Sequence, residues 1–185
     1  ATRERWTANL TTFSNEERLR EEGPPYCEIM FKATAEGTLE QRLWEHVRSR
    51  GYGPWVSVTT SEKGSYRQAD VLAFLERHLP KVDEPQSRRW RIIMADDYSA
   101  HLSPTVFALC WSRRYVFIPH GGGVTPVVQT PDTDLNQHVK RQYTDRETGD
   151  LLRQMRDGIV VPQLRQEECI DIMVDVLSNM ELHLN

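Results

Sequence analysis

The sequence predicts an α/β protein, and three observations lead to this prediction. Predicted strands alternate with predicted helices through the second half of the chain, as in an α/β sheet. The length of 185 residues is that of one domain with its own core. The composition, 38% hydrophobic and 27% charged, is typical of a globular chain rather than a disordered one.

The first half of the chain combines short strands with amphipathic helices. Three short segments rich in β-branched and aromatic residues predict strands, at residues 6–14, 26–33 and 54–60. The first two of these strands are expected to form an antiparallel pair. Two segments with apolar residues at helical spacing predict helices, at residues 38–50 and 67–79. Gly51 and Pro80 follow these segments and are typical helix stops.

The second half predicts two buried strands and three helices. The strands are residues 90–95, a continuous apolar run expected to be buried on both faces, and 115–118. Ser103-Pro104 predicts an N-cap followed by proline in the first turn of a helix that runs to about Trp111. The other two helices are expected at about residues 132–156 and 165–182. The apolar stripe of the last helix is typical of a core or of a dimer interface.

Charge and cysteine content restrict the class of function. A net charge of −4 argues against a free-standing duplex-binding domain, because phosphate neutralisation supplies most non-specific affinity for DNA. It leaves open a catalytic domain that another domain delivers to DNA. Three widely spaced cysteines without metal-ligand spacing predict buried, inert thiols in a reducing compartment. No apolar run approaches the roughly 20 residues of a membrane span, so we expect an intracellular protein that is neither secreted nor bound to a membrane.

Acidic side chains occur where predicted strands end and helices begin. The strand at 90–95 runs into Asp96 and Asp97, His101 follows, and Asp132 opens an amphipathic segment. Ligands gather at the carboxyl ends of strands in α/β sheets, and carboxylates from different elements are the ligands that Mg²⁺ requires in phosphodiester chemistry. The alternative is structural, with Asp96-Asp97 in a strand-to-helix turn and Asp132 as a helix N-cap.

The order of these motifs resembles the DDE superfamily endonuclease domain of mariner- and pogo-like transposases over most of residues 6–145. The resemblance starts with the TSEKG turn, the FLERHLP helix and the strand that ends at Asp96. It continues with Ser99, Ala100, His101-Leu102, Ile118-Pro119, Thr125, Gln129, Asp132, Asn136 and Lys140. The 35 residues between Asp96 and Asp132 also fit the family.

The resemblance implies an RNase H-like mixed sheet flanked by helices over residues 6–157, with a C-terminal helical extension at 158–185. It implies divalent-metal-dependent cleavage or strand transfer on DNA, in a nuclear setting, and it allows a homodimer. Asp96 and Asp132 would be the catalytic carboxylates and the ligands of Mg²⁺ or Mn²⁺.

The remaining candidate residues would have supporting roles. Asp97 would assist Asp96 or, as the alternative, be the metal ligand itself. His101 would hydrogen-bond Asp96 or polarise a phosphate, and Asn136 would support the site. Lys140 and Arg141 would contact the DNA backbone or belong to a solvated helix face.

One departure from the family pattern concerns its first catalytic carboxylate, which belongs to a first, central strand. Only Glu4 precedes the strand at 6–14, and Asn9 within it carries no charge. We therefore expect the chain to lack this first strand, which would leave the strands at 6–14 and 90–95 with an unpaired edge or paired with each other. A second departure is Gln129-Thr130-Pro131-Asp132, where the family has proline after glutamine and leucine before aspartate.

Two further hypotheses come from other functional classes. A domesticated or decayed transposase derivative that binds nucleic acid or protein without catalysis is favoured by the acidic net charge and by the absent first carboxylate. An α/β hydrolase is disfavoured, because no Gly-x-Ser-x-Gly motif surrounds Ser99.

Overall fold

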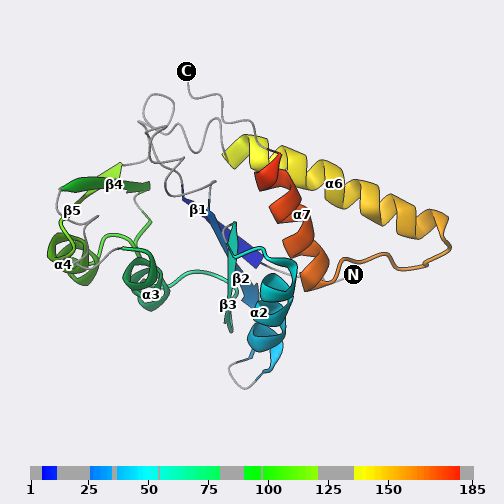
Figure 1. Ribbon diagram of the computed structural model, residues 1–185, viewed down its shortest axis with the longest axis horizontal. Helices are drawn as coiled ribbons and strands as arrows, with labels where there is room; N and C mark the ends of the chain where they lie inside the picture. The colour runs from blue at the N-terminus through cyan, green and yellow to red at the C-terminus, as the bar shows by residue number, and fades with distance from the viewer. Residues whose placement is uncertain are drawn as a thin grey trace. The chain divides into compact units, whose positions relative to one another are not determined.

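The computed structural model is a mixed α/β structure built from small sheets (Figure 1). It describes residues 6–11, 26–34, 37–53, 55–79, 90–96, 98–120 and 136–179. Within these residues there are five helices and five strands. The chain divides into two compact units. The first unit comprises Ala1–Ser65 with Asp134–Asn185, and the second comprises Tyr66–Thr133. None of the described helices is both long and apolar enough to cross a membrane.

A three-stranded mixed sheet forms the centre of the first unit. Its order is β1 (Trp6–Thr11), β2 (Tyr26–Lys32), β3 (Val56–Ser61). The β1 and β2 strands are antiparallel, as predicted, whereas β2 and β3 are parallel and are joined through a helix. Side chains alternate between the two faces of a strand, and most of the apolar ones lie on one face of this sheet, whereas Met30 is buried on the other.

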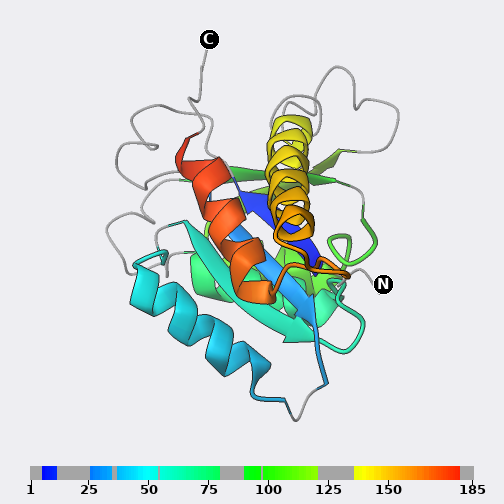
Figure 2. The same cartoon turned by 90° about the vertical axis from the view of Figure 1, so that its right-hand side faces the viewer.

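Three helices cover that apolar face and complete the core of the first unit: α2 (Leu39–Arg50), α6 (Asn136–Arg156) and α7 (Gln166–Ser178). Figure 2 shows α6 and α7 lying side by side over the sheet. The apolar stripe of α7 is confirmed as core, because it supplies Ile170, Met173, Val174 and Leu177 to the buried cluster. Gly51 ends α2 as predicted, in the left-handed conformation (φ 70°) that glycine adopts without strain.

The second unit contains a parallel pair of strands and two helices. Its elements are α3 (Gln68–His78), β4 (Arg91–Asp96), α4 (Pro104–Ser112) and β5 (Tyr115–His120). The predicted N-cap is confirmed, because the Val106 N–H donates to Ser103 Oγ over 3.2 Å and Pro104 is the first residue of α4. The two strands run in register from Arg91 beside Tyr115 to Asp96 beside His120.

The predicted burial of the strand at 90–95 on both faces is wrong in the described structure. In β4 the side chains alternate, with Ile92 63% and Met94 53% exposed, and Val116 and Ile118 of β5 are exposed on the same face. The physical reason is that α4, among the described helices, packs on the opposite face of this sheet, where the Phe107 and Phe117 rings lie 5.3 Å apart edge to face. A parallel sheet normally has both faces covered, so this open face is unusual.

Candidate functional site

Asp96 and His101 form a contacting pair at the carboxyl end of β4. Asp96 is the last residue of the strand, and its side chain is half exposed. His101 Nδ1 lies 2.7 Å from Asp96 Oδ1. The Tyr98 N–H makes a longer contact of 3.4 Å with the same oxygen. Because a carboxylate oxygen only accepts, Nδ1 of His101 donates in this pair.

The loop between Asp96 and α4 is held by its own hydrogen bonds. The His101 N–H donates to the Tyr98 carbonyl over 2.8 Å, which closes a turn. The Tyr98 hydroxyl donates to the Tyr66 carbonyl over 2.8 Å and anchors that turn to the segment before α3. The His101 ring packs edge to face against the Tyr98 ring and lies 6.5 Å from the Phe117 ring. These contacts fix the position of His101 relative to Asp96.

Sequence reasoning missed the supporting aromatic side chains of this loop. Tyr98 stands two residues after Asp96, and that spacing alone does not show that its ring supports a histidine. Phe117 comes from the neighbouring strand, so its contribution depends on the pairing of β4 with β5.

The other predicted site residues are either outside the described residues or in the first unit. Asp97 and Asp132 lie outside the described residues. Asn136 is the first residue of α6 and is partly buried, and Lys140 and Arg141 are exposed one turn further along that helix. Among the predicted residues that are described, the structure therefore brings Asp96 and His101 together.

The donor chemistry at the end of β4 fits one ligand of a divalent cation. An aspartate oxygen is a preferred ligand of Mg²⁺ and Mn²⁺, and imidazole nitrogen suits the softer divalent metals. Within the described ranges no group of three or more His, Cys, Asp or Glu side chains is arranged to hold a metal ion. The predicted second ligand, Asp132, is not among those residues.

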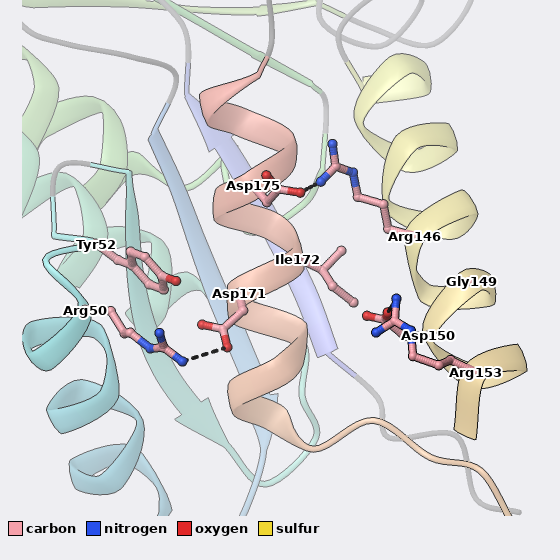
Figure 3. A pocket seen from close by; sticks show the side chains of 9 residues that line it. All are labelled: Arg50, Tyr52, Arg146, Gly149, Asp150, Arg153, Asp171, Ile172 and Asp175. Atoms are coloured by element: carbon pink, nitrogen blue, oxygen red, sulfur yellow. Dashed lines mark ion pairs between the residues drawn. The ribbon is translucent and has the colours of Figure 1, made fainter. Parts of the chain in front are cut away.

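A hollow of about 580 Å³ in the first unit is lined by charged residues of alternating sign (Figure 3). Its arginines each pair with an aspartate: Arg153 with Asp150 at 3.0 Å, Arg50 with Asp171 at 3.9 Å, and Arg146 with Asp175. Three positive and three negative side chains leave the hollow without net charge, so it offers little attraction for a phosphate. Two of these ion pairs, Arg50–Asp171 and Arg146–Asp175, link α2 and α6 to α7.

Asp171 is the most connected residue of this ionic network. His46 Nε2 lies 2.7 Å from Asp171 Oδ1, which ties α2 to α7. Partial burial raises the pKa of the Tyr52 hydroxyl, and the negative charge of Asp171 and a hydrogen bond to it raise that pKa further. Of these ion pairs, Asp150–Arg153 joins residues three positions apart on one helix, a spacing that the sequence alone can suggest.

A buried carboxylate lies on the other face of the three-stranded sheet. Glu28 of β2 is fully buried, and its strand neighbours are Asn9 of β1 and Ser57 of β3. The Ser57 hydroxyl donates to Glu28 Oε2 over 3.2 Å. Sequence reasoning missed Glu28, because a glutamate inside an apolar strand gives no signal of the neighbours that satisfy it.

The cysteines are free and buried, as predicted. Burial raises the pKa of the Cys110 thiol to about 11 and also raises that of Cys27. A thiol is nucleophilic only as the thiolate, so neither side chain is suited to nucleophilic catalysis at neutral pH.

The chain matches no protein-family model, no curated protein and no solved structure with which it was compared. The interpretation of the Asp96–His101 pair therefore rests on its geometry and on the order of motifs in the sequence.

Proposed function

We propose that the chain is a DDE-type endonuclease domain of a transposase that cleaves or transfers DNA strands with Mg²⁺ or Mn²⁺. Asp96 and Asp132 would be its catalytic carboxylates. The observation that carries the proposal is the position of Asp96, half exposed at the carboxyl end of a parallel strand. That end of a parallel sheet is where α/β proteins place their ligands.

The strand pattern supports an RNase H-like fold as part of the same proposal. The β1 and β2 strands are antiparallel and are followed by two parallel pairs, β2–β3 and β4–β5, each connected through a helix. The proposed fold contains a further strand that hydrogen-bonds to both β1 and β4. In the described part of the chain, β1 and β4 each have one edge without a strand partner, which is consistent with that requirement.

The side chains would divide the work of phosphodiester cleavage between them. When bound, the metal ion supplies positive charge that activates the attacking oxygen and stabilises the leaving oxygen. Asp96 would hold the ion with its carboxylate, and His101 would orient that carboxylate through the 2.7 Å contact from Nδ1. Lys140 and Arg141, exposed on α6, would contact the DNA backbone.

A second candidate is a non-catalytic derivative of such a domain that binds nucleic acid or protein. It is favoured by the net charge of −4 and by the absence of an aspartate or glutamate in residues 6–14. Both candidates allow a homodimer and a nuclear setting.

Asp96→Asn tests the catalytic proposal. We expect the variant to lose Mg²⁺- or Mn²⁺-dependent nicking of plasmid DNA while its circular dichroism spectrum and melting temperature stay unchanged. His101→Ala is expected to reduce nicking by roughly 10- to 100-fold, as for other residues that orient a metal ligand. Asp157→Asn, an exposed aspartate after α6, is the matched control and should nick like the wild type. Nicking retained by Asp96→Asn would refute the assignment. A wild-type protein that nicks DNA neither with nor without Mg²⁺ or Mn²⁺ would favour the non-catalytic candidate.

A further inference from the structure

Two tryptophans of the second unit are in contact with each other, with their ring planes tilted by 53°, and both are exposed to solvent. Trp90 immediately precedes β4 and is 53% exposed, and Trp111 in the last turn of α4 is 64% exposed. Their ring centroids are 4.6 Å apart. By contrast, Trp6, Trp44 and Trp55 are partly buried against the core of the first unit. Because tryptophan is highly buried on average, an exposed pair in contact indicates a surface that binds something.

Backbone hydrogen bonds place these two rings beside each other. The Arg114 N–H donates to the Trp111 carbonyl over 3.0 Å, and the Arg91 N–H donates to the Arg114 carbonyl over 3.0 Å. The turn after α4 is therefore bonded directly to the residue that follows Trp90. The platform formed by Trp90 and Trp111 depends on this backbone arrangement as well as on ring contact.

The conformation of Arg114 is a second unusual feature at this place. Its φ is 63°, in the left-handed region, and it is the only described residue other than glycine with a positive φ. Glycine is the usual residue where a helix ends in this conformation, because a side chain there is strained. Residues held in sparsely populated backbone conformations cluster at active sites and ligand-binding sites.

Three arginines adjoin the two tryptophans along the chain. Arg91, the first residue of β4, follows Trp90, and Arg113 and Arg114 follow the end of α4, where Arg113 donates to the Leu79 carbonyl over 3.4 Å. The Arg91 guanidinium donates to the Tyr115 hydroxyl over 2.7 Å and lies 5.6 Å from the centre of the Tyr115 ring. This local excess of arginine is notable in a chain with a net charge of −4.

We propose that Trp90, Trp111 and Arg114 form a binding surface for single-stranded nucleic acid. Unpaired bases would stack on the exposed tryptophan rings, and the arginines would contact the phosphates, which is how proteins bind single strands without sequence preference. A symmetric contact with a second copy fits the surface less well, since it would bring like charges together.

The choice of DNA as the ligand rests on the proposed function. Binding at this surface does not depend on any step of cleavage. Trp90 immediately precedes β4 and Asp96 ends it, about 20 Å away along a strand that rises about 3.3 Å per residue. The surface would therefore hold a single strand away from the bond that is cut.

Binding of fluorescent oligothymidylate of about 15 nucleotides, measured by anisotropy in EDTA, tests this surface. Trp111→Ala should weaken binding by roughly 5- to 150-fold, the range observed for loss of one base stack. Arg114→Gly removes one positive charge and also relieves the strained φ. This variant should bind oligothymidylate more weakly, and the slope of log binding constant against log salt concentration should become less steep by about 0.7. Its melting temperature should equal or exceed that of the wild type. A purely structural role for Arg114 predicts no change in binding.

Arg48→Ala, on the exposed side of α2 in the first unit, is the charge-matched control and should bind like the wild type. The proposal is overturned if the wild type does not bind oligothymidylate, or if it binds duplex DNA of the same length with equal affinity. So does unchanged binding by Trp111→Ala and Arg114→Gly. Self-association that Trp111→Ala abolishes, without oligothymidylate binding, would identify a contact between copies instead. Asp96→Asn should bind oligothymidylate normally, so failure of this surface and failure of the proposed cleavage are separate results.

Discussion

Replacement of Ile170 by alanine is expected to destabilise the first unit strongly. Ile170 lies on the apolar side of α7 with no exposed surface, in the cluster that joins α2, α6, α7 and the three-stranded sheet. The apolar side chains of that cluster fill the space between the helices and the sheet. Alanine at this position would leave a cavity that the helices can close only by moving.

The size of the effect follows from the atoms removed. Ile170→Ala deletes three buried carbon atoms, and about 0.8 kcal/mol for each gives about 2.4 kcal/mol of lost transfer free energy. The cavity adds to this value, and substitutions of this kind in other cores cost about 2–5 kcal/mol. We therefore expect the free energy of unfolding to fall by about 2.5–4 kcal/mol.

Urea unfolding followed by tryptophan fluorescence measures this change. In a Trp90→Phe, Trp111→Phe background the remaining tryptophans, Trp6, Trp44 and Trp55, all belong to the first unit and report its unfolding. The control is Val160→Ala, whose side chain is 94% exposed and whose loss should stay within about 0.5 kcal/mol. A loss below about 1 kcal/mol for Ile170→Ala, at an unchanged urea m-value, would refute the packing of α7 against the sheet.

Two further predictions concern the second unit. Burial and then the charge of Arg77 lower the pKa of His78 from 6.5 to about 4, so the unfolded chain binds this proton at a higher pH than the folded one. The contribution of neutral His78 to the free energy of unfolding is complete above about pH 6.5 and is lost as pH falls toward 4. Because His78 is partly exposed, we expect the free energy of unfolding to fall by about 1 kcal/mol or less over this range. Urea unfolding at pH 7 and pH 4.5 measures this pH dependence. His78→Gln should remove the part due to His78, whereas His138→Gln on α6 should keep it. A pH dependence of His78→Gln identical to that of the wild type would contradict the assignment. Ser103→Ala removes the cap bond to the Val106 N–H and should cost about 1 kcal/mol, seen as a fall of about 2–4 °C in melting temperature. Ser103→Asp retains a capping oxygen and should melt near the wild type, and an equal loss in both variants would show that the cap bond is not the cause.

Local features of the structure were predictable because they depend on neighbours in sequence. The helical spacing of apolar residues located α2 and α3, and Ser103-Pro104 identified the start of α4. The contact between Asp96 and His101 was among the predicted roles of the histidine, and a spacing of five residues across a turn makes such a contact geometrically accessible.

Burial of β4 was mispredicted because it depends on what packs on each face. A continuous apolar run is the usual pattern of a strand covered on both sides. In the described structure, however, α4 covers one face and leaves Ile92 and Met94 exposed. The run itself contains no information about which neighbouring elements are present.

The amino-acid sequence by itself indicated the helices, the strands, the N-cap of α4, the glycine that ends α2 and the acidic residue at the end of β4, since these follow from side-chain periodicity and short-range hydrogen bonding. Tertiary structure alone decided which distant side chains meet. The parallel register of β4 and β5 and the turn at Arg114 bring Trp90 beside Trp111, 21 positions later in the chain. Packing of α7 against α2 likewise creates the His46–Asp171 contact. The physical reason is that contacts between distant residues depend on strand register and on helix packing, which the chain establishes only when its core forms.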